Sequence, residues 1–517
     1  MRAFKRFSSL WLLQTAVVGA VTACDPMIGS GISVGPSPGT DSTSLESRVL
    51  WTAESVARRH SLRREVDFAH VENNGWKECF HGGQLRLCGK ASGNTTQLLL
   101  TEFPSFHFSP LAESIRRELA DSLRVRFDSQ RVRECEWNGR TGTCKAQPAS
   151  GTTTFRLEGN RVYVLLDFLV PDGTTHPAYA YVDMGASDMA LAGPLYDSLG
   201  VNKDTPARFK VGDYIVAVPS SSIQRGGRPA VRGSGPQLEG SLPASVLAAH
   251  TLVLDYARKT LTLADPGVVR PRGTPVPFRL DTATGLIVVD ATIGGENYPI
   301  TIDNGSAYTW LRQGTVRQWL LRHPEWQRGV GAVGTANMML RGEEPEREGI
   351  LIRIPELSIG AVRLTDVGAL GVAGGRGADT TLALMDWYSK KNAVSVLGWL
   401  GGSVLKEFQI TVDYPRRTIY WLRESAADTA ELHQIGLTLR TASGAVYVAG
   451  VATKNGKPTV DGVQPGDNLI SVGGYDLVSG TIGQIFESMH GVPGEARQLV
   501  LERDGARFTV RATITAF

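Results

Sequence analysis

The chain has 517 residues, and its 54 Lys and Arg residues nearly balance its 51 Asp and Glu residues, which leaves a net charge of +3. This balance gives no indication of the basic charge excess that is typical of nucleic-acid-binding proteins, so no nucleic-acid partner is expected. The length predicts roughly three or four domains, and the 58 glycines favour strands joined by tight turns over long helices.

The first residues are typical of an export signal. Three basic residues precede an apolar stretch at 10–21 that is too short for a membrane span, which predicts a signal peptide at 1–23. The sequence Val-Thr-Ala-Cys that ends at Cys24 resembles a bacterial lipobox, and this resemblance implies cleavage before Cys24 and lipid attachment to it. Residues 24–45, rich in Gly, Pro, Ser and Thr, are predicted to form a tether. The expected location is the cell envelope, periplasmic or at the cell surface, with contact to the membrane through the anchor. A plain secretory signal with an incidental cysteine is the alternative.

Residues 46–150 contain two cysteine pairs of equal spacing. Each pair brackets turn residues, so the simplest pairing is two local disulfides across hairpins, Cys79–Cys88 and Cys135–Cys144. Export makes disulfides plausible, and a zinc site is the alternative. The region carries no motif that indicates a family, and a cover segment, a partner-binding module and a stabilising cap all fit its sequence.

The middle of the chain is a duplication. Asp183 opens the segment Asp-Met-Gly-Ala-Ser, Asp303 opens Asp-Asn-Gly-Ser-Ala, and each follows a β-rich run. Residues 240–263 and 398–421 align without a gap and share Gly, Leu, Ser, Val, Leu, Asp, Tyr, Arg and Thr at identical offsets. We therefore expect two similar lobes, one at 155–265 and one at 276–424. A pseudo-two-fold axis between them would bring Asp183 and Asp303 together.

The repeated Asp-x-Gly segments and the later Gly-x-x-x-x-Ser-Val-Leu…Asp-Tyr pattern resemble the pepsin and retropepsin-like aspartic proteases. The resemblance implies a bilobal double β-barrel, mainly β, with Asp183 and Asp303 as catalytic residues that activate a water molecule against a peptide bond. It implies peptide or protein substrates and neither a metal nor a cofactor. The expected supporting residues of the catalytic loops are Gly185, Ser187, Asn304, Gly305 and Ser306.

The residue after each Asp departs from the family pattern, where a Thr or Ser hydroxyl joins the two loops. Met184 offers only a weak acceptor, whereas Asn304 has an amide that can partly compensate. The alternative is therefore a catalytically inactive peptide-binding or scaffolding lipoprotein. Residues 211–229 are the expected substrate-covering flap, and Tyr214 is its candidate aromatic residue, with a core position as the alternative.

Residues 433–515 resemble a PDZ domain, most clearly in Val-Gln-Pro-Gly-Asp-Asn-Leu-Ile at 463–470. The resemblance implies an α+β domain that binds a peptide C-terminus or strand between a sheet edge and a helix. We expect the edge strand near 446–451 and the helix at 483–490.

Overall fold

The computed structural model describes residues 28–36, 42–64, 76–92, 94–102, 108–126, 131–137, 142–145, 148–201, 206–226, 238–335, 344–372, 380–442 and 444–517. The chain forms two compact units, of which the first ends at Gln147 and the second begins at Pro148. The fold is mainly β, as the sequence predicts. The predicted signal peptide and Cys24 lie outside the described residues.

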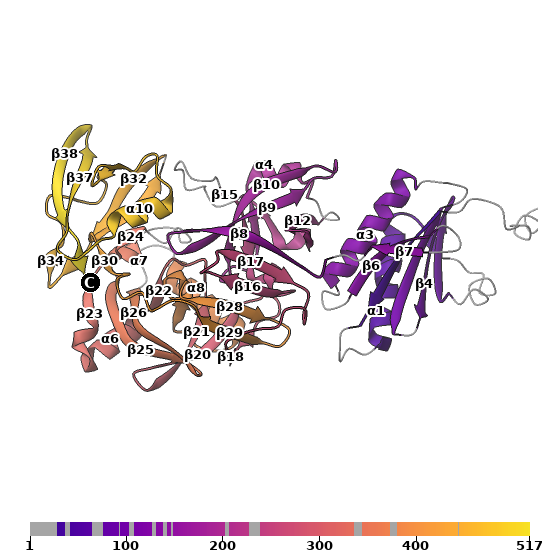
Figure 1. Ribbon diagram of the computed structural model, residues 1–517, viewed down its shortest axis with the longest axis horizontal. Coiled ribbons are helices and arrows are strands. Elements are labelled where there is room, and N and C mark those ends of the chain that lie inside the picture. The colour runs from indigo at the N-terminus through magenta and orange to yellow at the C-terminus, as the bar shows by residue number, and fades with distance from the viewer. Residues whose placement is uncertain are drawn as a thin grey trace, which may run out of the picture. The chain divides into compact units, whose positions relative to one another are not determined.

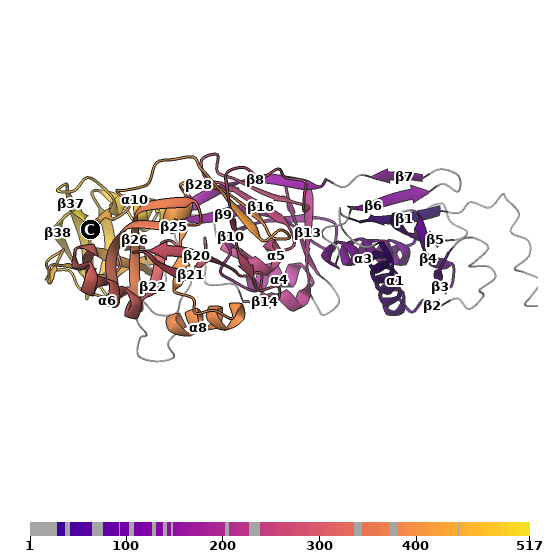
Figure 2. The same ribbon diagram turned by 90° about the horizontal axis from the view of Figure 1, so that it is seen from below.

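In the first unit, two helices cover one face of a seven-stranded sheet (Figure 2). The strand order is β2-β3-β4-β5-β1-β6-β7, and one apolar core lies between the sheet and the helices. The elements are β1 (Ile28–Gly35), α1 (Ser42–Arg59), β2 (Arg63–Arg64), β3 (Glu78–Gly82), β4 (Leu85–Ser92), β5 (Thr95–Glu102), α3 (Pro110–Arg126), β6 (Arg131–Trp137) and β7 (Gly142–Lys145).

The tether prediction for residues 24–45 is wrong where these residues are described. Strand β1 lies inside the sheet and pairs with β5 on one side and β6 on the other. Its Ile32 and Val34 are buried in the core. The composition of this segment resembles a linker, which explains the prediction. Its apolar residues alternate with small ones, and this pattern forms a strand when the strands on both sides pair with its backbone N–H and carbonyl groups.

The cysteines lie in two hairpins. Cys79 and Cys88 face each other across β3 and β4 and form a disulfide, which confirms this predicted bridge and excludes zinc ligation by that pair. Cys135 is also disulfide-bonded, and the β6–β7 register sets its backbone opposite Cys144. The second bridge stays a prediction that this register favours.

The second unit contains two lobes, of which lobe 1 is magenta to pink and lobe 2 is salmon to orange in Figure 1. Lobe 1 contains β8 (Ser150–Glu158), β9 (Arg161–Leu169), β10 (Thr175–Asp183), β11 (Met189–Leu191), α4 (Gly193–Ser198), β12 (Ala207–Val211), β13 (Tyr214–Val218), β14 (Ile223–Arg225), β15 (Leu238–Pro243), α5 (Ala244–Leu247), β16 (Thr251–Asp255) and β17 (Thr260–Ala264). Lobe 2 contains β18 (Thr274–Pro277), β19 (Arg279–Leu280), β20 (Ile287–Ile293), β21 (Glu296–Ile302), β22 (Thr309–Arg312), α6 (Gln313–Arg322), β23 (Gln327–Val330), β24 (Gly334–Thr335), α7 (Glu344–Arg347), β25 (Ile350–Ile359), β26 (Val362–Val372), α8 (Thr380–Asn392), β27 (Gly398–Leu400), α9 (Gly402–Leu405), β28 (Phe408–Asp413) and β29 (Thr418–Arg423).

The lobes are joined by the antiparallel pair β16 and β28. Val253 lies opposite Thr411, and these are equivalent residues in the 240–263 and 398–421 alignment. On either side of that pair, Thr251 lies opposite Asp413 and Asp255 lies opposite Gln409. Thr251 is equivalent to Gln409 and Asp255 to Asp413 in the alignment, so a two-fold rotation about the central pair exchanges these two outer pairs. The register of this pair therefore has the pseudo-two-fold symmetry that the sequence predicts.

The C-terminal elements form a third body within the second unit. They are β30 (His433–Gln434), β31 (Leu437–Ala442), β32 (Ala445–Val451), β33 (Thr453–Lys454), β34 (Lys457–Pro458), β35 (Asn468–Val472), β36 (Tyr475–Asp476), α10 (Ile482–Met489), β37 (Ala496–Arg503), β38 (Ala506–Thr513) and β39 (Thr515–Ala516). Helix α10 begins with a capping box at Thr481 and occupies the predicted helix position. The expected edge strand is wrong, because β32 pairs with β31 and β35 and is interior, whereas β31 lies next to the end of the sheet.

Candidate active site

Two equivalent crossings place the aspartates at the ends of buried strands. Strand β10 ends at Asp183, and β21 ends one residue before Asp303. Strand β15 runs parallel to β10 and sets Pro243 beside Asp183, whereas β27 runs parallel to β21. The Asp303 N–H donates to the Leu400 carbonyl at 3.0 Å. Each aspartate therefore begins a loop whose start is fixed by backbone pairing.

The two loops meet face to face. A Cβ placed on Gly305 would lie 2.4 Å from Asp183 Oδ1 and 3.1 Å from Asp303 Oδ1. The two carboxylate oxygens are therefore no more than about 5.5 Å apart, within the range at which one charge changes the ionisation of the other. A Cβ on Gly185 would lie 2.5 Å from Asp303 Cγ, so only glycine permits this approach on either side.

Both carboxyl groups are held by their own loops. The Gly185 N–H donates to Asp183 Oδ1 at 3.1 Å, and the Gly305 N–H donates to Asp303 Oδ1 at 2.9 Å. Asp183 is 1% exposed and Asp303 is 7% exposed. The pair is therefore preorganised and nearly closed to solvent, with Asp303 as its more accessible member.

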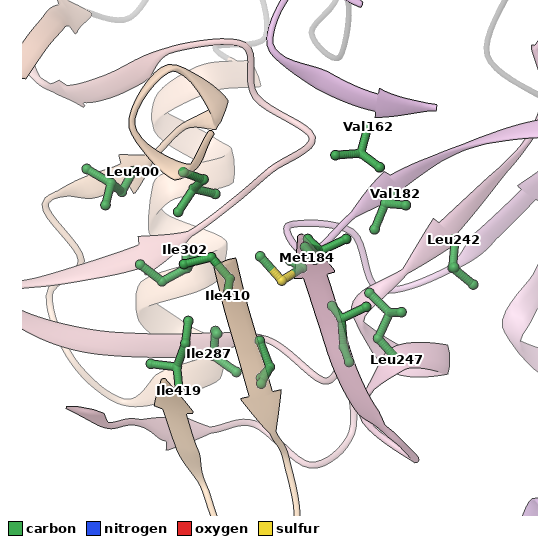
Figure 3. Close-up of a cluster of buried hydrophobic side chains, with 14 of the residues drawn as sticks. Val162, Val182, Met184, Leu242, Leu247, Ile287, Ile302, Leu400, Ile410 and Ile419 are labelled. Atoms are coloured by element: carbon green, nitrogen blue, oxygen red, sulfur yellow. The ribbon is translucent and has the colours of Figure 1, made fainter. Parts of the chain in front are cut away.

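A side-chain hydrogen bond joins the two loops through the residues that follow the aspartates. The Met184 N–H donates to Asn304 Oδ1 at 2.9 Å, and both residues are fully buried. The Met184 side chain lies in the apolar core between lobe 1 residues such as Val182 and lobe 2 residues such as Ile302 and Ile410 (Figure 3). Asn304 thus accepts a bond across the interface, and Met184 contributes packing in place of a hydroxyl.

The remaining predicted supporting residues have different partners. The Ser187 hydroxyl donates to Asp188 Oδ2 at 2.9 Å. This bond is made to the neighbouring carboxylate and not to Asp183, which was the expected partner. The Ser306 hydroxyl donates to the Tyr308 carbonyl at 2.8 Å and accepts from Trp399 Nε1 at 2.8 Å. Ser306 therefore braces the loop against β27.

Sequence reasoning missed two donors that reach each loop from the opposite lobe. Arg161 of lobe 1 is 2% exposed, and its Nε donates to the Gly305 carbonyl at 2.9 Å. The Tyr388 hydroxyl of α8 in lobe 2 donates to the Gly185 carbonyl at 2.5 Å. The buried Arg161 guanidinium also places a positive charge beside the loop of Asp303, where it favours an anion nearby. Neither residue carries a local motif that would reveal this role.

The hairpin turn that precedes Arg161 also contacts the C-terminal body. Glu158 is 5% exposed, and its Oε2 accepts from the Gly483 N–H at 2.6 Å and from the Thr481 hydroxyl at 2.7 Å. A carboxylate at the start of a helix is favourable because it satisfies free N–H groups and interacts with the helix dipole. The β8–β9 turn thus connects α10 to the loop of Asp303.

Two further expectations concern the surroundings. Tyr214 is 5% exposed, and its hydroxyl donates to Asp265 Oδ1 at 2.7 Å, so it is a core residue and its candidate role in a flap is wrong. Residues 227–229 of the expected flap lie outside the described residues. Within the described part of the chain, no group of His, Cys, Asp and Glu side chains has the arrangement of a metal site. Among those same residues, no helix combines the length and apolar character that a membrane crossing needs.

Comparison with known proteins gives distant structural similarities. No family model and no curated protein matches the chain. One solved structure with local similarity is a photosystem II D1 C-terminal processing protease, with 18% identity over 16% of this chain and 23% of that protease and a TM-score of 0.15. Basic 7S globulin from soybean has 12% identity over 54% of this chain and 99% of its own, with a TM-score of 0.31. Conglutin gamma from lupine seeds has 10% identity over 54% of this chain and 96% of its own, with a TM-score of 0.33.

Proposed function

We propose that this protein is an aspartic endopeptidase that hydrolyses peptide bonds with the Asp183 and Asp303 pair. The observation that carries the proposal is the approach of the two carboxylates to within about 5.5 Å from equivalent loops. Two carboxyl groups this close share one proton, because ionising both has a large repulsive cost.

The proposed reaction needs only the pair and one water molecule. The ionised carboxylate accepts a proton from the water as the water oxygen attacks the carbonyl carbon of the substrate. The neutral carboxyl donates a hydrogen bond to the carbonyl oxygen, and a proton from the pair then passes to the leaving nitrogen as the C–N bond breaks. General acid–base assistance of this kind contributes on the order of 10²–10⁴ in rate.

The test is digestion of a peptide library at acidic and at neutral pH by the purified protein, with products identified by mass spectrometry. Asp183→Asn and Asp303→Asn are each expected to abolish cleavage. Asp290→Asn is the matched control, because Asp290 is exposed and paired with Arg279 in a hairpin of lobe 2, and it is expected to cleave normally. Cleavage that survives both active-site substitutions would overturn the proposal.

A second candidate function is an inactive peptide-binding or scaffolding protein. It is favoured by Met184, which lacks the hydroxyl of the family pattern, and by the 1% exposure of Asp183. Peptide binding without any cleavage, equal in the protein and in Asp303→Asn, is the result that would select it.

We also propose that residues 433–515 bind a peptide C-terminus or strand in the manner of a PDZ domain, and that the protein is exported and lipid-anchored at Cys24. The support for both is the sequence resemblance. Incorporation of a labelled fatty acid, lost in Cys24→Ser, tests the anchor.

A further inference from the structure

A peptide that binds between a sheet edge and helix α10 would lie beside β31, because the strand near 446–451 is interior, and we call this place the β31–α10 site. Strand β24 of lobe 2 pairs in parallel with β31, with Gly334 opposite Thr438 and Thr335 opposite Leu439. A Cβ on Gly334 would lie 3.0 Å from Cε2 of Phe486 in α10 and 2.8 Å from Gln434 Oε1. Strand β24 therefore lies between the strand and the helix, as Figure 1 also shows for its position beside α10.

The residues before β24 add contacts of the same kind. The Thr438 hydroxyl donates to the Ala332 carbonyl at 2.6 Å, and Ala332 and Val333 are both buried. A cavity of about 30 Å³ lies beside them and is lined by Ala332, Val333 and Phe486 among other residues. An extended segment that gains backbone pairing at a sheet edge and places small apolar side chains toward a helix has the features of peptide recognition by strand addition.

We propose that residues 332–335 are an internal ligand of the β31–α10 site, so that an extended peptide with small uncharged residues binds there only by displacing them. This proposal rests on the proposed peptide-binding role of residues 433–515. The preference for small residues follows from Gly334, because any side chain at that position meets the Phe486 ring and the Gln434 amide. A linked segment competes at an effective concentration on the order of millimolar, which weakens the apparent affinity for a free peptide.

The experiment measures binding of one defined probe, a fluorescein-labelled peptide with the sequence of residues 329–337, by fluorescence anisotropy. Every protein carries Asp303→Asn, so that hydrolysis of the probe does not enter the result. Gly334→Val is designed to expel β24, since its side chain collides with Phe486 at a backbone φ of 84°. Gly295→Val is the matched control, because Gly295 has a φ of 82° in an exposed turn of lobe 2 with no atom within 4 Å of an added Cβ.

We expect Gly334→Val to bind the probe at least about tenfold more tightly than the parent protein, and Gly295→Val to bind it as the parent does. If Gly334→Val fails to fold, Val333→Ser replaces it in the experiment, because it removes an apolar contact without adding volume. We expect Val333→Ser also to bind the probe more tightly than the parent protein does. Equal binding by the parent and by a folded variant would overturn the internal ligand and leave peptide binding intact. No binding by any of them would overturn both, and the proposed hydrolase activity would remain to be judged by its own assay.

Discussion

The bond between Met184 and Asn304 makes a testable prediction, because it joins the two loops that carry the aspartates. In Asn304→Ala, the Met184 N–H loses its acceptor at 2.9 Å and stays buried. Asn304 Nδ2 is buried and has no partner among the described atoms, so its removal has no matching cost.

Two opposing effects determine how much stability Asn304→Ala loses. A buried N–H without a partner costs about 1–3 kcal/mol, and relief of the unpaired Nδ2 returns part of that, which leaves about 1–2 kcal/mol. The loops would also lose one of the contacts that position them, and a displacement of about 1 Å at reacting groups lowers rates by on the order of 10²-fold. We therefore expect kcat to fall about 10–100-fold and KM to change less, because the geometry of the pair affects chemistry more than binding.

Thermal unfolding followed by tryptophan fluorescence measures the first effect, and cleavage kinetics on a peptide found in the library digest measure the second. The control is Asn297→Ala, which removes an exposed amide that bonds Thr292 in a hairpin of the same lobe. We expect the control to unfold and to cleave like the parent. If Asn304→Ala also unfolds and cleaves like the parent, the bond does not hold the loops together and the reasoning is refuted.

Three other predictions follow from described contacts. Burial raises the pKa of Glu431 to about 7 from its ordinary 4.5, against the opposing effects of Arg353 and the Gly368 N–H. The contribution of Glu431 to stability is therefore largest below about pH 4.5 and falls by about 3 kcal/mol as the pH rises to 7. The difference in unfolding temperature between the parent and Glu431→Gln should change across that range, and a constant difference would contradict the assignment. Glu158→Gln should weaken the start of α10 by about 1 kcal/mol and speed amide exchange there, whereas Glu487→Gln on the exposed side of α10 should not. Replacing Cys79 and Cys88 by serine should destabilise the first unit by about 2–3 kcal/mol, read as faster proteolysis of the β3–β4 hairpin, and equal proteolysis would contradict it.

The features that could be predicted from the sequence are those that the duplication repeats. Asp183 and Asp303 begin equivalent Asp-x-Gly segments of the two halves, so symmetry predicts their approach. Asp255 and Asp413 occupy identical offsets in the aligned segments, and each accepts from the backbone N–H of the arginine three residues later. A repeated pattern shows the same local structure twice in one sequence, so each copy supports the prediction made from the other.

The features that could not be predicted are contacts between distant, non-equivalent residues. Arg161 and Tyr388 bond carbonyls 144 and 203 residues away, and nothing in their local sequence marks this. Strand β24 is short and lies in a glycine-rich stretch, so only the partner strand β31 defines it as a strand. Strand β1 is missed for the same reason, because its neighbours in the sheet come from much later in the chain.

The difference between Met184 and Asn304 has a consequence for how such a site is able to change. In an assembly of two identical subunits, one substitution alters both loops at once: two methionines would leave no acceptor, and two asparagines would remove the apolar filler. Fusing the halves into one polypeptide breaks this constraint, so that one loop specialises in filling space and the other in accepting a hydrogen bond. In this chain, one half therefore supplies the apolar packing and the other supplies the hydrogen-bond acceptor, whereas each of two identical subunits would have to supply both.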